Sequence, residues 1–324
     1  MKDRTQKVVV EGERSSSICV RSGVPQGSVL GPSLFLAYIN DLPTRVSSVS
    51  RLFADDTLIH RLMKSLRDQE TIQQDLNNLE KWESEWEMDF HPKKCNVLPV
   101  NRSKRKKQTE ERQDYNLHGE TLETVNETKY LGVTLQNNLN WDKHINNICV
   151  KANRMLGMLR RNLKGAPKKT KELGYKALVR PVLEYACGVW DPYCKNQIEK
   201  IEKTQRRAAR FVMNNYKKTE SVSKMIEDLK WDSLEKRRKK ARLQMFYKIH
   251  TEKVHVQFGG RLKKLPARSG RRGHSEMYER ISSKSDYRLH SYLPRTIRDW
   301  NSLPLTTVQA PSTEAFSSRV SSSL

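Results

Sequence analysis

The hydrophobic pattern of this chain changes its period near Trp141, and this change limits the folds that the chain can adopt. Before that point, short runs of β-branched residues alternate with turns that contain glycine or proline, and the stretch 66–88 has helical spacing. After it, apolar residues recur at helical spacing through 145–159 and 198–212. Because strands and helices need apolar faces of different period, the sequence predicts an α+β fold, with strands mainly in the first part and helices in the second.

Three regions are expected along the 324 residues, a length that exceeds the usual size of one domain. Residues 1–140 should form hairpins and short strands, residues 141–250 a basic helical region, and residues 251–324 a loop-rich extension with a Ser-rich end. The first region should contain a hairpin over 7–20 around Gly12, a short helix from Ser33 to about Leu42, a hairpin over 115–125 with Gly119 at its turn, and strands within 93–100 and 129–135.

The positive charge of the chain is confined to its second part. Residues 1–100 carry 13 basic and 14 acidic side chains, a net of −1, which leaves +25 for residues 101–324. Such a region suits a polyanion, because cationic side chains displace the counterions of phosphates. We expect the nucleic-acid backbone to contact Arg206, Arg207, Arg210 and the run 235–242, although basic runs are also ordinary solvated helix faces.

The cysteines and the hydropathy indicate a soluble intracellular protein, without distinguishing nucleus from cytoplasm. The five cysteines are scattered, odd in number and without a Cys-x-x-Cys pair, so we expect reduced thiols and no structural zinc. No stretch approaches the ~18 consecutive apolar residues of a membrane span, and the start has no apolar signal core. No membrane partner is expected.

Two adjacent carboxylates, Asp55 and Asp56, stand in "RLFADDTLIH", residues 51–60, between apolar flanks. Asp-Asp pairs are common in solvated turns, and a hairpin tip that holds both residues remains open. The flanks have strand composition without Gly, Pro or Asn, which favours a buried strand. Because buried carboxylates need a cation and hard oxygen ligands suit Mg²⁺ or Mn²⁺, the sequence predicts a divalent metal site.

A loop rich in glycine and proline, "SGVPQGSVLGPSLFLAYINDLP" at residues 22–43, precedes the Asp pair. Glycine permits close approach of the backbone to a ligand, and the amide of Gln26, between Pro25 and Gly27, can bond the edge of a base or a sugar. Together, the loop and the Asp pair resemble the reverse transcriptases of non-LTR (LINE-like) retrotransposons. The resemblance continues through "FHPKKC", "KYLGVTL", "LVRPVLEYACGVWDPY", "TQRRAARFVMNNY", "WDSLEKRRKKARL" and "YLPRTIRDWNSLP", and covers roughly residues 8–305.

This resemblance implies an RNA-directed DNA polymerase fragment: an incomplete right-hand palm over 1–140, a helical basic thumb over 141–250 and a C-terminal extension over 251–324. Asp55 would be a metal-binding catalytic aspartate supported by Asp56, with Mg²⁺ or Mn²⁺ as cofactor. The implied partners are an RNA template, a DNA primer and deoxynucleoside triphosphates. The residues implied to bind template base, nucleotide or primer end are Pro25, Gln26, Gly27, Phe53 and Lys94, and those implied for the primer grip are Tyr130, Leu131 and Gly132.

Two features of the sequence weigh against a full active site. Without the resemblance, Lys94 is more simply explained as a surface lysine ahead of a strand than as a residue that binds phosphate. The family also has a further catalytic aspartate on a strand before the Pro-Gln-Gly loop, whereas only 24 residues precede Pro25 here and their one aspartate, Asp3, lacks strand context. Two adjacent aspartates are too few to hold two metal ions, so we expect this chain to be incomplete and inactive alone.

Two other interpretations remain open. The charge distribution favours a non-enzymatic RNA- or DNA-binding remnant, whereas the Asp pair and Gln26 favour the polymerase. An unfolded remnant is the third interpretation, because a palm sheet without a central strand would leave unpaired edges and exposed apolar faces.

Overall fold

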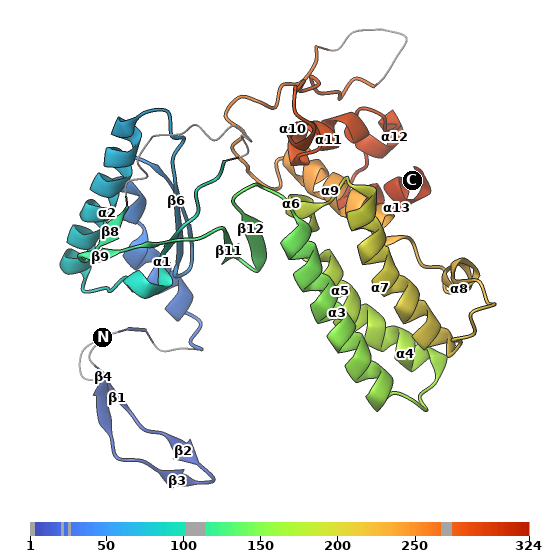
Figure 1. Ribbon diagram of the computed structural model, residues 1–324, viewed down its shortest axis with the longest axis horizontal. Coiled ribbons are helices and arrows are strands. Elements are labelled where there is room, and N and C mark those ends of the chain that lie inside the picture. The colour runs from blue at the N-terminus through green and yellow to red at the C-terminus, as the bar shows by residue number, and fades with distance from the viewer. Residues whose placement is uncertain (1–3, 21–22, 25–26, 102–113, 267–273, 324) are drawn as a thin grey trace. The chain divides into compact units, whose positions relative to one another are not determined.

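The computed structural model in Figure 1 describes residues 4–20, 23–24, 27–101, 114–266 and 274–323. The described residues form both helices and strands, which confirms the predicted mixed class. The chain divides into two compact units, Met1–Leu131 (unit 1) and Gly132–Leu324 (unit 2). No helix within the described ranges is both long and apolar enough to cross a bilayer. All five cysteines are free thiols, as predicted.

Unit 1 begins with an extended hairpin, as the sequence predicts. Its strands form two antiparallel pairs: β1 (Arg4–Gln6) with β4 (Ile18–Val20), and β2 (Val9–Val10) with β3 (Glu13–Arg14). Glu11 and Gly12 form the turn with φ values of 50° and 91°. The positive φ of the second turn residue explains the glycine there, since glycine adopts it without steric cost.

Three helical segments and the β-hairpin of residues 49–60 form the core of unit 1. The helical segments are α1 (Gly31–Ile39), the 3₁₀ turn η1 (Leu42–Arg45) and α2 (Leu66–Trp86). The helix predicted from Ser33 to about Leu42 therefore exists, but it ends at Ile39 and is followed by a 3₁₀ turn with Pro43 in its first turn. The buried side chains are Ile39, Leu42, Val46, Leu79 and Trp82.

Short strands complete unit 1. β7 (Asn96–Val97) pairs in parallel with β10 (Glu123–Thr124), and β8 (Asn116–Leu117) pairs antiparallel with β9 (Glu120–Thr121). The predicted hairpin around Gly119 is thus confirmed, and its turn residues His118 and Gly119 both have positive φ, 54° and 71°. β11 (Glu127–Tyr130) ends this unit.

A network of hydrogen bonds around Asp68 starts α2. The Asp68 carboxylate accepts hydrogen bonds from the Arg61 Nε (2.9 Å), the Lys64 N–H (3.0 Å) and the Ser65 hydroxyl (3.0 Å). These bonds lower the pKa of Asp68 to about 2, in the order given. A carboxylate in the first helical turn also interacts favourably with the helix dipole.

The ionised form of Asp68 should stabilise the start of α2 at ordinary pH. Its folded-state pKa of about 2 lies below the ~3.9 of an unperturbed aspartate. The stabilisation is therefore present above about pH 4 and is lost as the pH falls toward 2. In Asp68→Asn this part of the pH dependence of unfolding should disappear, and titration by NMR checks it directly. A measured pKa near 4 would contradict the assignment.

Unit 2 is helical, and two hydrophobic cores lie along it. It opens with β12 (Val133–Gln136) and continues with α3 (Asp142–Asn162), α4 (Lys168–Gly174), the π-helical turn η3 (Tyr175–Val179), α5 (Arg180–Glu184), α6 (Cys187–Trp190), α7 (Lys195–Met213), α8 (Val222–Asp228) and α9 (Leu234–His250). In Figure 1, α3 and α7 lie side by side. The first core contains Ala152, Leu156, Trp190, Ile201, Ala208 and Leu234.

The second core of unit 2 lies between α9 and the C-terminal helices α10 (Asp286–Leu289), α11 (Tyr292–Trp300), α12 (Leu305–Val308) and α13 (Thr313–Ser323). Its buried side chains include Phe246, Ile297, Trp300 and Phe316. The extension predicted as loop-rich over 251–324 therefore contains four helices after Ser285. Because α9 contributes Leu234 to the first core and Phe246 to the second, this one helix joins the two.

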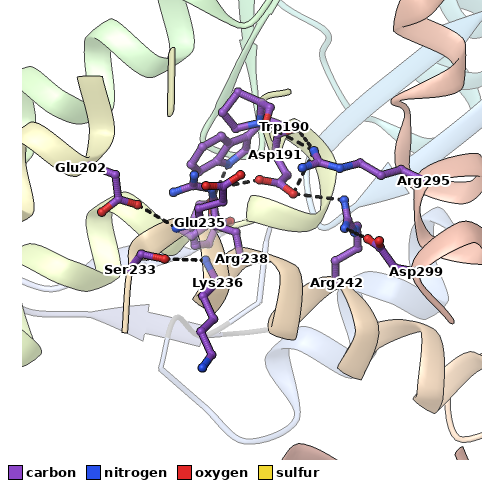
Figure 2. Close-up of polar contacts among 12 residues, drawn as sticks. Trp190, Asp191, Glu202, Ser233, Glu235, Lys236, Arg238, Arg242, Arg295 and Asp299 are labelled. Atoms are coloured by element: carbon purple, nitrogen blue, oxygen red, sulfur yellow. Dashed lines mark hydrogen bonds and ion pairs between the residues drawn. The ribbon is translucent and has the colours of Figure 1, made fainter. Parts of the chain in front are cut away.

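The buried carboxylate of Asp191 lies where α9 and α11 approach each other, and Figure 2 shows its partners. Arg238 Nε donates to Asp191 Oδ1 at 2.9 Å, and Arg242 Nη1 donates to Oδ2 at 3.1 Å. From α11, Arg295 Nη1 lies 3.1 Å from the same Oδ2 and donates to the Asp191 carbonyl at 3.0 Å. Arg242 also pairs with Asp299.

Two arginines of the run 235–242 are thus buried, which corrects the expectation that this cluster as a whole contacts a phosphate backbone. Arg238 and Arg242 have side-chain exposures of 0% and 1%. Leu234, Arg238, Arg242 and Phe246 recur every four residues, so both arginines lie on the apolar stripe of α9. Burial, followed by the nearby Arg295, lowers the pKa of the Arg242 guanidinium.

Replacing Asp191 with alanine should destabilise unit 2, because the buried Arg238 would lose its carboxylate partner and the buried Arg242 would lose one of two. We expect a loss of about 3–5 kcal/mol in the free energy of unfolding, measured by urea denaturation. Asp232→Ala is the matched control, since Asp232 forms a more exposed pair with Lys236 at 3.4 Å, and such pairs contribute about 0–1 kcal/mol. Equal losses in the two variants would contradict the role of Asp191.

Candidate functional site

Asp55 and Asp56 lie at the tip of a β-hairpin in unit 1. β5 (Val49–Phe53) pairs antiparallel with β6 (Asp56–His60), and Phe53 is opposite Asp56. Ala54 and Asp55 therefore form the turn, and Ala54 has a φ of 50°. Leu52 and Ile59 pack against the core of unit 1, so the two strands anchor the tip.

The strands predicted on both sides of the Asp pair are confirmed, but the predicted burial is wrong. Both aspartates are exposed, because the chain reverses at Ala54 and Asp55 instead of continuing as one strand. The hairpin tip that the sequence left open is thus present, one residue earlier than expected, with Ala54 in place of Asp56 at its centre. Exposure removes the argument that burial alone demands a cation.

The carboxylates at the tip are ligands of the type that a divalent ion prefers, but there are too few of them to complete a metal site. Carboxylate oxygens are the ligands that Mg²⁺ prefers, and Asp55 with Asp56 provides two carboxylates. Across the described ranges, no group of three or more His, Cys, Asp or Glu side chains is arranged to hold a metal ion. A two-metal site would therefore need ligands beyond this pair.

The other residues expected near the nucleotide are only partly described. Pro25 and Gln26 lie outside the described residues, and Gly27 has a φ of 81° that favours glycine. Phe53 is 62% exposed beside the tip. Lys94 is exposed at the end of the 3₁₀ turn η2 (Pro92–Lys94). Among the described residues, no hydrogen bond or ion pair joins Lys94 or Gly27 to the Asp pair.

The segment expected to form the primer grip is a tight turn. Tyr130 ends β11 and Val133 begins β12, and the residues between them, Leu131 and Gly132, have φ values of 45° and 81°. A Cβ at Gly132 would meet Tyr185 Cε1 at 3.1 Å. Both the conformation and this close approach therefore favour glycine at position 132.

The three arginines expected to contact nucleic acid lie on α7 and have partners within unit 2. Arg206 pairs with Glu199, Arg207 Nη1 donates to Asn153 Oδ1 at 2.9 Å, and Arg210 Nη1 donates to the Lys217 carbonyl at 2.9 Å. Arg207 is exposed and the other two are half-buried. Each guanidinium has five N–H donors, so these contacts use only a part of its capacity.

A second group of cations in unit 2 was not singled out from the sequence. It surrounds a cavity at the ends of α3 and α7, and its members are Arg160, Arg161, Lys164 and Lys171. The signal in the sequence is the basic run "RRNLK" at the end of α3. That run alone has an ordinary explanation, because cations at a helix C-terminus interact favourably with the helix dipole.

Comparison with known protein families identifies a class for the first part of the chain. Residues 3–135 match the family model described as reverse transcriptase (RNA-dependent DNA polymerase). This segment contains the Asp55–Asp56 hairpin and the turn at Leu131 and Gly132. The predicted resemblance to the reverse transcriptases of non-LTR (LINE-like) retrotransposons is confirmed by this match and by the similar proteins below.

Similar curated proteins are polymerases of mobile elements. The chain is 31% identical over 231 residues to the RNA-directed DNA polymerase from mobile element jockey of Drosophila melanogaster, and this covers 65% of the chain and 24% of that protein. It is 29% identical to the jockey polymerase of Drosophila funebris, over 64% of the chain and 24% of that protein. It is 28% identical to the probable RNA-directed DNA polymerase from transposon X-element of Drosophila melanogaster, over 60% of the chain and 22% of that protein.

The similar segments span about a quarter of the length of these relatives. No solved structure matches the chain.

Proposed function

We propose that this chain carries the distal palm and the thumb of a retrotransposon reverse transcriptase, in which Asp55 and Asp56 take part in nucleotidyl transfer. The observation that carries the proposal is the pair of exposed carboxylates at an anchored hairpin tip, inside the segment that matches the reverse transcriptase family. The palm would extend over 1–140, the basic thumb over 141–250 and a C-terminal extension over 251–324.

Each residue of the proposed site has a role that its chemistry allows. Asp55 would be the direct metal ligand and Asp56 its support, and the bound Mg²⁺ or Mn²⁺ would supply activation of the primer 3′-oxygen and charge stabilisation of the leaving pyrophosphate. The exposed ring of Phe53 would lie beside the primer end. Pro25, Gln26 and Gly27 would shape the pocket for template base and nucleotide, Lys94 would neutralise phosphate charge, and Tyr130, Leu131 and Gly132 would position the primer.

The 324-residue chain by itself should not extend a primer. Its two adjacent carboxylates are fewer than two metal ions need, and the described residues hold no larger acidic cluster. The second candidate, a non-enzymatic protein that binds RNA or DNA, is favoured by the net charge of +25 over residues 101–324. Arg206, Arg207 and Arg210 would then contact phosphates without any chemistry.

Asp55→Asn should abolish most primer extension in a longer protein in which a palm and fingers segment is joined ahead of this chain. The change keeps the volume of the side chain and removes the charge that a cation requires. Extension should fall by orders of magnitude, since the metal contributes several kcal/mol and each ~1.4 kcal/mol is tenfold in rate. Asp56→Asn should do less damage, because Asp56 begins β6 and would ligate indirectly.

The control for this experiment is Asp89→Asn, which removes an exposed carboxylate of unit 1 that does not belong to the β5–β6 hairpin. Primer extension is measured for all three variants beside the parent, and binding of an RNA–DNA duplex is measured to show that the fold survives. If the pair only shapes a turn, asparagine replaces aspartate well and both variants should extend normally. Normal extension by Asp55→Asn would therefore exclude the metal-ligand role.

Duplex binding by the 324-residue chain should depend steeply on salt and little on sequence. Phosphate contacts release counterions, so we expect the affinity to fall roughly a thousandfold or more between about 50 and 200 mM salt. Fluorescence anisotropy with two RNA–DNA duplexes of unrelated sequence measures both properties. Affinity that is independent of salt, or equal binding by residues 1–100 alone, would remove the proposed contribution of the basic region.

A further inference from the structure

A cavity of about 490 Å³ in unit 2 lies beside α4 and the last turns of α3 and α7. Its size falls within the ~300–1,000 Å³ of small-molecule sites. The charged side chains that line it are all cations, Arg160, Arg161, Lys164 and Lys171, and two aromatic side chains, Phe211 and Tyr216, complete the wall. This combination of charge and rings differs from that of an ordinary solvated basic face.

A second cavity of unit 2, about 300 Å³ between α9 and α11, provides a contrast. It is also lined by cations, but Lys239 lies 3.5 Å from Asp299 and Arg242 pairs with the same carboxylate. Glu235 adds a further negative charge to its wall. The wall of the α9–α11 cavity therefore contains carboxylates that pair with some of its cations, whereas the cavity beside α4 has no carboxylate among its described lining residues.

Lys171 is the most informative residue of the cavity beside α4. It is only 5% exposed, and its side chain forms no hydrogen bond or ion pair with any described residue. Its Nζ lies 5.7 Å from the centre of the Phe211 ring. A cation–π contact of this kind is weak, so Lys171 has no anionic partner among the described residues, and its ammonium group at the cavity can accept one.

Tyr216 provides an accessible ring at the same cavity. It is 48% exposed, and the Arg160 guanidinium carbon lies 5.0 Å from its ring centre. Arg210 Nη1 donates to the Lys217 carbonyl at 2.9 Å and to the Asn215 carbonyl at 3.5 Å, so it fixes the segment that carries Tyr216. Aromatic rings and guanidinium planes beside cations are how proteins hold unpaired bases and their phosphates.

We propose that this cavity binds one unpaired nucleotide of a single-stranded nucleic acid. Its phosphate would lie at Lys171 and Arg161, and its base would stack on Tyr216. A hollow that holds a single nucleotide favours a single strand, because a base of a duplex would first have to leave its stack and its partner. The inference rests on the proposed function in one respect, namely that the chain binds polynucleotides.

The test uses the 324-residue chain and a tetrauridylate in which one base is 5-iodouridine. After photo-crosslinking and trypsin digestion, the label should lie in peptide 211–217, which contains both Phe211 and Tyr216. Lys171→Met should weaken binding of the tetrauridylate about tenfold, because it removes one phosphate contact and keeps the aliphatic packing on Phe211. Lys169→Met, an exposed lysine of the same helix, should change it less than about twofold.

Further measurements separate the proposal from simpler explanations. Tyr216→Leu changes an exposed side chain, so it should keep the fold and still remove the crosslink, which covers the case in which Lys171→Met fails to fold. Equal weakening by Lys169→Met, or a crosslink outside 211–217, would overturn the site. Equal binding of an abasic tetranucleotide would overturn the base contact. Failure of the parent chain to bind an RNA–DNA duplex would instead count against the proposed function.

Discussion

The carboxylate of Asp191 is the interaction on which the arrangement of unit 2 depends. It pairs with guanidinium groups from α9 and α11 at one buried point, where the two cores of the unit meet along α9. Buried ion pairs cost much of their attraction in lost hydration, so this cluster is a weak source of net stability. Its geometry is demanding, however, and we infer that it fixes how the C-terminal helices dock on α9.

The basic residues of unit 2 divide into two groups with different partners. Arg238, Arg242 and Arg295 pair with carboxylates inside the protein. The cations beside α4 have no such carboxylate among the described residues that surround them. The net charge of the region therefore overstates the number of cations that a polyanion can contact, and the location of the carboxylates decides which ones those are.

Periodicity predicted the helices α2, α3 and α7, because the spacing of apolar residues such as Leu76, Leu79 and Trp82 reports an apolar face directly. It did not predict the partners of Arg238, since Asp191 lies 47 residues earlier in the chain and only the folded arrangement brings the two together. The site was partly predictable, because local composition located the strands beside Asp55. The chain reversal at Ala54 has no signal in the composition, since Ala54 is a non-glycine residue with a positive φ.

The anchoring of the β5–β6 hairpin has a consequence for how variation in this protein is interpreted. Leu52 and Ile59 pack on the core a few residues from the tip, and a two-residue turn between paired strands has little freedom of its own. The position of the Asp55 carboxylate is thus determined by hydrophobic packing of the hairpin strands. Substitutions at Leu52 or Ile59 that weaken this packing would shift both carboxylates while the Asp-Asp sequence stays the same. A survey of polar residues alone would not detect them.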